Sequence, residues 1–436
     1  MKKILISFSL LLTAVITLVS CGDGNRIDQK GGMGIPQEPT IVGVKSVPGG
    51  AVIKVAIPDD PNLKGVVATY QRNGTTVESR ISRYLDTLVV EGYADEKEHD
   101  VVIRSFNADD AKSEGQTVKI TPLVAPVKTA KFEAFESFGG IKIRITDNPT
   151  LAKLALVVQC DQNNPDQDLA YDQRKWKDVS TFFTESNSVV VTRRGLEAVP
   201  TVFAFHFRDD FGNVSETQLI KLTPKEEVAL NKKLCKHYPV DDDNFVNDTG
   251  GGGVGALFDG VYNGNGKFFL AAKGNPIPTW LTIDLGQEAS ISRIATKPRW
   301  DYMPFQSGNI REWEFWGIDV DPRQDLIDNP ANKDGADYQS RHGFSRGWFM
   351  IAKGEQYKPS GYAPDGSVDG WTSEDREYYL NSTEYECDNT NPLTPRAFDK
   401  IRYLRIVVVN TFESWQYKQT SGGWFIGEVS PYGQIY

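Results

Sequence analysis

The sequence predicts an all-β protein in which three β-sandwich modules follow one another. Short runs of alternating apolar and polar residues recur along the chain, separated by turn-forming residues roughly every 8 to 12 positions. A chain of 436 residues is also too long for one hydrophobic core. The net charge of −10 and the lack of a dense block of Lys and Arg argue against nucleic acid as a partner.

The chain begins with residues 1–20, which are typical of a signal peptide. Two lysines precede an apolar run from Ile4 to Val19 that is too short and too early for a stable spanning helix. The run leads into Leu-Val-Ser-Cys21, which matches the bacterial lipobox, where a small residue precedes a cysteine that becomes acylated and N-terminal. We expect Cys21 to carry lipid and anchor the protein. An ordinary signal peptide with a chance cysteine is the alternative.

Residues 21–38 form a polar, Gly-rich tether with nothing to pack. The start of the chain resembles surface-exported lipoproteins of the Bacteroidetes type, which often carry acidic residues just after the cysteine. Asp23 and Asp28 are the acidic residues at that place. We therefore expect a lipid-anchored protein of the outer membrane that is exposed at the cell surface.

Residues 39–123 and 124–224 repeat one pattern over about 90 to 100 residues. Two glycines precede an alternating strand in each, Gly49 and Gly50 in the first and Gly139 and Gly140 in the second. An Asp-Asp pair, a Ser-Glu pair and a Thr-Pro pair follow in the same order. The alternation indicates two β-sandwiches, and the pattern resembles fibronectin type III. We expect these two modules to act as spacers. A role in ligand binding is the alternative.

Residues 225–255 are predicted to be a short helix from Glu226 to Lys236 and then a linker that ends in a run of glycines. The run is not a phosphate-binding loop, because no Lys-Ser or Lys-Thr follows it. Asp241 to Asp243 could ligate calcium, but the loop lacks the spaced acidic pattern of a calcium loop. A solvated turn is therefore expected there.

Residues 256–436 contain an ordered set of motifs. An Asp-Gly turn at Asp259 is followed by Trp280-Leu-Thr-Ile-Asp-Leu-Gly, then by Arg402-Tyr-Leu-Arg-Ile, and finally by Glu428-Val-Ser-Pro-Tyr-Gly. Leu281, Ile283 and Leu285 alternate with Thr282 and Asp284, which is the period of a half-buried strand. The set resembles the discoidin family, also called the coagulation factor five/eight type C domain. The resemblance implies a jelly-roll β-sandwich, and many members are carbohydrate-binding modules whose ligand sits on loops at one end.

The aromatic residues of this module fall into two groups. Trp280, Trp313 and Phe315 lie in alternating strands and are predicted to be core, with Glu312 and Glu314 on the solvent side of one of those strands. Other rings and one arginine lie in polar loops, where an exposed ring can stack on a sugar and an arginine can donate to hydroxyls. The expected carbohydrate-binding residues are Arg299, Trp300, Tyr302, Trp415 and Tyr417. The alternative is that such rings only anchor long loops.

The family resemblance also implies a structural calcium ion, held beside the Asp-Gly turn by Asp259 and by Glu428 of the last strand. Hard oxygen ligands at a Gly-rich loop suit calcium. The chain departs from the family in lacking the Thr and Trp that usually follow the turn. It also carries a long irregular insertion, residues 320–398, that could roof or remodel the usual ligand site.

The remaining cysteines, Cys160, Cys235 and Cys387, are odd in number. One bridge is possible in an oxidising compartment, and Cys235 with Cys387 is the favoured pair because both belong to the terminal part of the chain. The sequence shows no nucleophile motif, no zinc motif and no carboxylate pair that stands out, so we do not expect an enzyme.

These observations predict a non-catalytic, lipid-anchored surface protein whose terminal module binds carbohydrate. The layout resembles accessory lipoproteins of Bacteroidetes polysaccharide-utilisation systems, which capture a polysaccharide for a neighbouring outer-membrane transporter. The alternative is a protein-binding adhesin or a structural component of an envelope complex.

Overall fold

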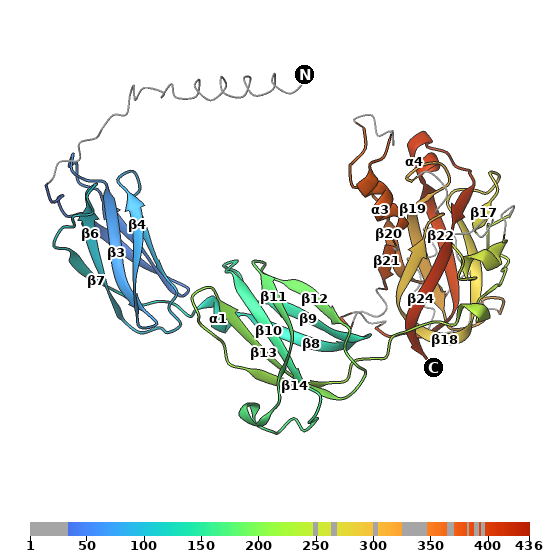
Figure 1. Cartoon of the computed structure of the whole chain (residues 1–436), viewed down its shortest axis with the longest axis horizontal. Coiled ribbons are helices and arrows are strands. Elements are labelled where there is room, and N and C mark those ends of the chain that lie inside the picture. Colours follow the sequence, from blue (N-terminus) through green and yellow to red (C-terminus); the bar gives the residue numbers. More distant parts are fainter. Residues whose placement is uncertain are drawn as a thin grey trace, which may run out of the picture. The chain divides into compact units, whose positions relative to one another are not determined.

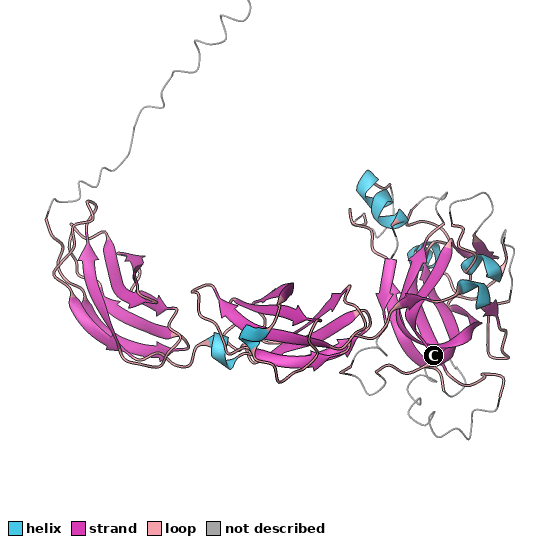
Figure 2. Ribbon diagram, turned by 60° about the horizontal axis from the view of Figure 1, so that its bottom comes forward, coloured by secondary structure: helices cyan, strands magenta, loops and turns pink. Residues whose placement is uncertain are grey.

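We describe a computed structural model of the chain (Figure 1). It describes residues 34–246, 252–262, 268–299, 304–324, 347–363, 370–381, 383–387, 392–393 and 397–436. The predicted signal peptide, Cys21 and most of the tether lie outside the described residues. The predicted all-β fold is confirmed, since strands dominate every module and helices are short (Figure 2). No helix within the described ranges is both long and apolar enough to cross a membrane.

The first module is a sandwich of a three-stranded and a four-stranded antiparallel sheet. The strand orders are β1-β2-β5 and β4-β3-β6-β7. Its core is made of fully buried aliphatic side chains from both sheets, including Ile53, Val66 and Ile103. The strands are β1 (Thr40–Val47), β2 (Gly50–Ala56), β3 (Gly65–Arg72), β4 (Thr75–Ser82), β5 (Thr87–Glu91), β6 (His99–Phe106) and β7 (Gln116–Ile120).

The second module has the same topology, which confirms the internal repeat. Its strand orders are β12-β9-β8 and β11-β10-β13-β14. A short helix, α1 (Pro126–Thr129), precedes it, and a 3-10 turn, η1 (Tyr171–Gln173), lies between two of its strands. The strands are β8 (Lys131–Ser137), β9 (Gly140–Thr146), β10 (Leu154–Asp161), β11 (Lys177–Thr184), β12 (Val189–Arg194), β13 (Thr201–Asp209) and β14 (Gln218–Leu222).

The repeated glycine pairs serve one purpose in both modules. The first glycine of each pair, Gly49 or Gly139, has a positive φ, of 71° and 59° respectively, which closes the hairpin between the first two strands. A Cβ on Gly50 would lie 1.9 Å from the carbonyl oxygen of Val90, and a Cβ on Gly140 would lie 1.8 Å from that of Arg193. The motif therefore reflects a strand-to-strand approach that only glycine allows.

Residues 225–246 differ from the predicted helix and linker. Val228–Ala229 (β15) pairs with β24 (Glu428–Ile435), and Lys236–His237 (β16) pairs with β18 (Thr279–Lys297). Within the predicted helix, Lys232–Leu234 (η2) is the helical part, and it is a single 3-10 turn. The helix prediction was wrong because Leu230 is buried in the core of the terminal module, and its amide donates to a carbonyl of β24, so tertiary contacts override local helix propensity.

The acidic run that follows, Asp241 to Asp243, was predicted to be a solvated turn, but Asp242 and Asp243 pair with a buried arginine. The guanidinium of Arg405, which is 0% exposed, donates to Asp242 over 2.6 Å and 3.2 Å and lies 3.3 Å from Asp243. Asp243 also accepts from the hydroxyl of Thr282 over 2.7 Å. Burial raises the pKa of Asp243, although Arg405 opposes that shift. The run fixes this segment onto the strands that carry Thr282 and Arg405.

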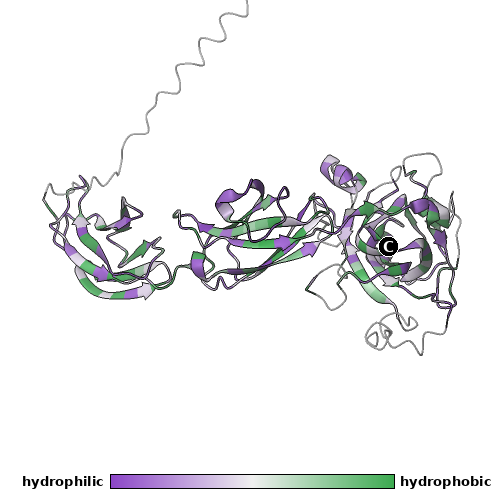
Figure 3. Ribbon diagram, turned by 90° about the horizontal axis from the view of Figure 1, so that it is seen from below, coloured by the Kyte–Doolittle hydropathy of each residue, from purple (hydrophilic) through white to green (hydrophobic). Residues whose placement is uncertain are grey.

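The terminal module is one large antiparallel sheet folded around a core, with strand order β15-β24-β18-β22-β19-β20. Figure 3 shows hydrophobic and hydrophilic residues alternating along its strands. β16 and β21 also pair with β18, and β17 pairs with β23. The further elements are η3 (Val254–Leu257), β17 (Phe269–Ala271), β19 (Ile310–Ile318), β20 (Phe349–Glu355), α3 (Ser373–Leu380), β21 (Thr383–Glu386), β22 (Ile401–Thr411), α4 (Phe412–Tyr417) and β23 (Trp424–Ile426).

The long strand β18 pairs with two different strands along its length. Its first half pairs with β22, and its second half pairs with β24. The halves meet near Gly286, which has φ of 68° and would bring a Cβ within 2.7 Å of Leu234. Leu281, Ile283 and Leu285 are fully buried, as their spacing in the strand predicts. Thr282 between them is also fully buried, and its hydroxyl donates to Asp243.

Two other core predictions have mixed outcomes. Trp313 and Phe315 are buried as predicted, whereas Trp280 is half-buried on the opposite side of the sheet. Glu314 was predicted to face solvent but is 2% exposed, and it accepts a hydrogen bond of 3.0 Å from the indole of Trp316. The prediction failed because this outer face carries a second apolar cluster, built around Trp316 and Trp348, that encloses the carboxylate.

Cys160, Cys235 and Cys387, the three cysteines that the structure describes, are not joined in a disulfide, so the favoured bridge is not formed. Cys160 and Cys387 are buried, and Cys235 is half-buried. Cys235 and Cys387 both pack in the main hydrophobic cluster of the terminal module. Burial raises the pKa of Cys160, and it raises the pKa of Cys235 to about 12, so these two residues behave as apolar core side chains.

Candidate functional site

The strands that precede the predicted binding loops finish at the same end of the terminal module. The carbonyl of Lys297, the last residue of β18, accepts from the amide of Gly427 over 2.9 Å. The amide of Phe412 in α4 donates to Asn309 over 3.0 Å, and that of Phe425 in β23 donates to Gly308 over 3.0 Å. These bonds bring four distant segments together beside α4, and we call this region the α4 end (Figure 1).

α4 forms because its first turn is capped. The hydroxyl of Thr411 accepts from the amide of Ser414 over 3.0 Å, and the hydroxyl of Ser414 accepts from the amide of Thr411 over 2.8 Å. This capping box satisfies amides that a short helix would otherwise leave unpaired. Lys418 ends the helix in the left-handed conformation, with φ of 52°. The cap and the stop together set the direction in which the side chains of Trp415 and Tyr417 leave the helix.

Arg299 is held by aromatic rings at the α4 end. Its guanidinium carbon lies 3.8 Å from the centroid of the Phe268 ring and 5.4 Å from that of Phe425. Such cation–π contacts orient the guanidinium. Trp300 and Tyr302, which lie one and three residues after Arg299, are outside the described residues.

Trp415 and Tyr417 differ in exposure. Trp415 is half-buried, with the Arg311 guanidinium carbon 4.2 Å from its ring centroid and the Tyr362 ring centroid 5.2 Å away. Tyr417 is 64% exposed. Side chains of the protein therefore cover part of the Trp415 ring, whereas the Tyr417 ring is open to solvent.

An open groove lies on the outer face of β19, beside Arg311. It has a volume of about 340 Å³ and is lined by Glu312, Trp313, Glu314, Lys353, Gly354, Glu355 and Val409. Arg311 pairs with both Glu312 and Glu355, and Asn410 donates to Glu312 over 2.9 Å. Carboxylates of this kind can accept hydrogen bonds from hydroxyl groups. The sequence pattern predicts Glu312 and Glu314 only as solvent-facing residues and not as part of a groove. The pairing of Glu312 with Glu355 follows from the register of β19 and β20.

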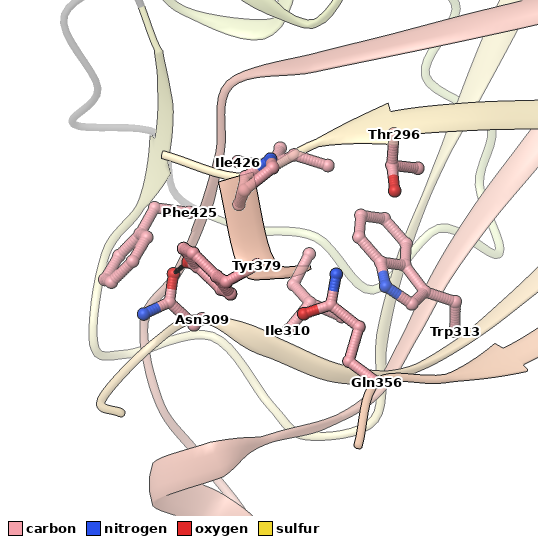
Figure 4. A pocket seen from close by; sticks show the side chains of 9 residues that line it. Thr296, Asn309, Ile310, Trp313, Gln356, Tyr379, Phe425 and Ile426 are labelled. Atoms are coloured by element: carbon pink, nitrogen blue, oxygen red, sulfur yellow. Dashed lines mark hydrogen bonds between the residues drawn. The ribbon is translucent and has the colours of Figure 1, made fainter. Parts of the chain in front are cut away.

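A small cavity beneath the α4 end is shown in Figure 4. Its volume is about 10 Å³, which is room for roughly one water molecule and far too little for a sugar ring. The Tyr379 hydroxyl donates to the side chain of Asn309 in its wall. The indole of Trp313 and the amide of Gln356 also line it. The cavity belongs to the support of the α4 end and not to a ligand site.

The described part of the insertion packs against the α4 end. Helix α3 begins with a capping box at Thr372, and Tyr379 within it packs edge-on against Phe305. Asp375, which is fully buried, accepts from the amide of Ser360 over 2.9 Å, from its hydroxyl over 2.7 Å, and from the amide of Thr372 over 2.8 Å. Burial alone would raise the pKa of Asp375, but these hydrogen bonds outweigh it and lower the pKa to about 2.

The two predicted calcium ligands lie close together, but their contacts do not fit a metal ion. Glu428 is buried and accepts from the ammonium of Lys232 and from the amide of Gly260 over 3.0 Å. The Asp259 carboxylate accepts from the amide of Val261 over 2.8 Å. Burial raises the pKa of Glu428, and Lys232 lowers it. Among the described residues, no group of three or more His, Cys, Asp or Glu side chains could hold a metal ion.

Three protein-family models match the chain, and each is described only as a domain of unknown function. DUF4959 matches residues 36–122, DUF5126 matches residues 120–233, and DUF5000 matches residues 258–433. No curated protein matches the chain.

Among solved structures, the chain is similar to a SusE-like protein, with 25% identity, a TM-score of 0.42, and coverage of 71% of this chain and 100% of that one. It is also similar to a family 32 carbohydrate-binding module of Clostridium perfringens NanJ in complex with galactose, at 13% identity and a TM-score of 0.26, covering 47% and 98%. A third is the C-terminal domain of a Bacteroides fragilis chitobiase, at 16% identity and a TM-score of 0.27, covering 48% and 99%.

Proposed function

We propose that this protein is a non-catalytic glycan-binding protein of the cell surface, and that its terminal module binds a polysaccharide at the α4 end. The observation that carries the proposal is the open ring of Tyr417 on the same end as Arg299 and the Glu312 groove. A flat ring can stack on the apolar face of a sugar, while arginine and carboxylates bind its hydroxyls. No metal or reactive cofactor is needed for this chemistry.

The predicted residues take different roles in this proposal. Tyr417 supplies stacking surface, and Trp415 adds the part of its half-buried ring that Arg311 and Tyr362 leave accessible. Arg299 donates to sugar hydroxyls. Trp300 and Tyr302 lie within three residues after Arg299 in the chain and remain proposed contributors to the same surface.

The proposal includes a lipid anchor on Cys21 in the outer membrane. The lipobox supports the anchor, and the tether with two spacer modules would carry the terminal module away from the membrane. In that place the protein would act as an accessory that captures a polysaccharide for an outer-membrane glycan transporter.

An array of immobilised polysaccharides tests the proposal. Galactan, galactomannan, xyloglucan, amylopectin, yeast mannan and mucin would be probed with the purified full chain and with Tyr417→Ala. Tyr436→Ala is the matched control, because this half-exposed tyrosine follows the other end of β24. Binding by the wild type and the control, with loss in Tyr417→Ala, supports the proposal. Equal binding by all three proteins would place the site elsewhere.

A second candidate function is that of a protein-binding adhesin or envelope component. The observation that favours it is the aromatic packing of the insertion against the α4 end, where Tyr379 contacts Phe305 and Tyr362 contacts Trp415. Such packing covers ring surface that a sugar would otherwise use. Failure to bind every polysaccharide on the array, together with retention of a partner from the outer membrane by cross-linking, would favour this alternative.

A further inference from the structure

The two repeated modules differ most at one loop. In the first module, Asn73 and Gly74 alone connect β3 to β4, with φ of 49° and 76°, as a two-residue hairpin turn requires. In the second module, the equivalent strands β10 and β11 are joined by residues 162–176. Because both modules have the same strand order, the fold does not need this extra chain, and we call it the β10–β11 loop.

A buried arginine organises the β10–β11 loop. The side chain of Arg174 is 0% exposed, and its guanidinium donates to the carbonyls of Leu169 over 3.1 Å, Asn164 over 3.0 Å, and Asp166. The buried carboxylate of Asp161 lies 3.6 Å from it. A buried charge is tolerated only when it is paired and its donors are satisfied, so these bonds hold the loop in one conformation.

The ordered loop presents an aromatic pair. The rings of Tyr171 and Trp176 stack with centroids 4.9 Å apart and planes 29° apart, and the indole donates to the carbonyl of Tyr171 over 2.9 Å. The guanidinium carbon of Arg174 lies 5.7 Å from the Trp176 ring centroid. Tyr171 is 41% exposed. Trp176 and the folded loop therefore fix the orientation of a ring that solvent can reach.

Polar groups lie at the edge of this ring. The Tyr171 hydroxyl donates to the Gln159 side-chain oxygen over 2.8 Å, and the Gln159 amide donates to Asp178 over 2.9 Å. Both Gln159 and Asp178 lie on strands, so their positions are fixed by the sheet. A fixed ring with an amide and a carboxylate beside it suits a pyranose, whose flat face is apolar and whose rim carries hydroxyls.

We propose that Tyr171, Gln159 and Asp178 form a second carbohydrate subsite, on the second module, that takes one sugar ring of a neutral polysaccharide. The inference rests on the proposed function, because a second weak subsite on the same chain strengthens binding to a polymer through effective concentration. The exposed charges around it, Asp166, Asp168, Asp172 and Asp178 against Lys175 and Lys177, are mainly negative and disfavour uronic acids.

Affinity electrophoresis of the full chain tests the subsite, in gels containing galactan, galactomannan, xyloglucan, amylopectin or yeast mannan. We expect Tyr171→Ala to weaken retardation severalfold in the gel that retards the wild type, and Tyr171→Phe to retain most of it. Tyr171→Leu keeps an apolar contact with Trp176 but lacks a flat ring, so it should stay folded and also weaken retardation severalfold, which tests the subsite even where Tyr171→Ala misfolds. Phe183→Ala is the matched control, because this side chain on β11 is 74% exposed.

Tyr417→Ala, run in the same gels, separates this inference from the proposed function. Unchanged retardation of folded Tyr171→Leu, with weaker retardation of Tyr417→Ala, would overturn the second subsite and leave the α4 end intact. Weaker retardation of Tyr171→Leu, with none lost in Tyr417→Ala, would support the subsite and remove the α4 end as the site. If no polysaccharide retards the wild-type protein, both the second subsite and the site at the α4 end are overturned.

Discussion

At the scale of single residues, Asp375 shows how hydrogen bonds set a charge inside the insertion. Its pKa of about 2 lies below the ordinary value of 3.8, so its ionised form stabilises the fold above about pH 4, and this stabilisation is lost as the pH falls toward 2. A shift of this size corresponds to about 2 kcal/mol. We expect Asp375→Asn to lower the unfolding free energy at pH 7 by that order and to flatten the loss between pH 4 and pH 2.

Tryptophan fluorescence during urea unfolding measures this change, since eight of the nine tryptophans lie from Trp280 onward. Glu374→Gln is the matched control, because the adjacent Glu374 is exposed. Equal acid sensitivity of Asp375→Asn and the wild type would show that these hydrogen bonds do not stabilise the fold.

The pairing of Lys232 with Glu428 gives a second prediction at this scale. Removing the ammonium leaves a buried carboxylate without its charge partner, so Lys232→Met should destabilise the terminal module by roughly 1 to 3 kcal/mol. Lys233→Met, at the exposed neighbour, should change stability little.

The same pairing predicts how calcium affects stability. Since the ammonium of Lys232 already pairs with Glu428, we expect the melting temperature of the wild type to be the same in calcium and in chelator. A rise with calcium would support the ion that the family resemblance implies.

At the scale of elements, the glycine pairs make the hairpins of both repeats testable. A Cβ on Gly140 would meet the backbone of β12 at 1.8 Å, a distance that only movement of a strand can relieve. We expect Gly140→Ala to destabilise the second module by more than about 3 kcal/mol, because the added methyl group would clash with backbone that cannot move without displacing a strand. Gly43→Ala in β1 is the control, since nothing lies within 4 Å of its Cβ. Differential scanning calorimetry should show one lowered transition; an unshifted one would contradict the packing argument.

The elements that the sequence predicted well were those with strict alternation. Leu281, Ile283 and Leu285 were identified as one buried face because a strand has a period of two. The segment from Glu226 to Lys236 was predicted as a helix because helix propensity depends only on neighbouring residues. Its structure instead depends on pairing with β24 and β18, which lie far away in the sequence. Glu314 alternates like a surface residue, and only the second apolar cluster reveals that it is buried.

At the scale of the whole molecule, the order of motifs predicted more than any single motif. The family resemblance that rests on this order implies that Asp259 and Glu428 lie near each other, and the amide of Gly260 does donate to Glu428. The resemblance also implies that the ligand loops lie at one end of the module, and the segments after β18 and β22 do lie together at the α4 end. It could not predict how much of Trp415 is covered, because Arg311 and Tyr362 reach it through tertiary packing. Nor could it show that the β10–β11 loop is ordered by a buried arginine.

The most direct measurement of the central claim is the affinity of the full chain for a polysaccharide selected on the array, compared between the wild type, Tyr417→Ala and Tyr436→Ala. Loss of one stacking ring should cost on the order of 1 kcal/mol or more, which is a severalfold increase in Kd. Isothermal titration, with melting curves alongside, should show this loss in Tyr417→Ala at an unchanged melting temperature and no loss in Tyr436→Ala. Equal affinity of all three folded proteins would contradict the assignment of the α4 end as the glycan-binding site.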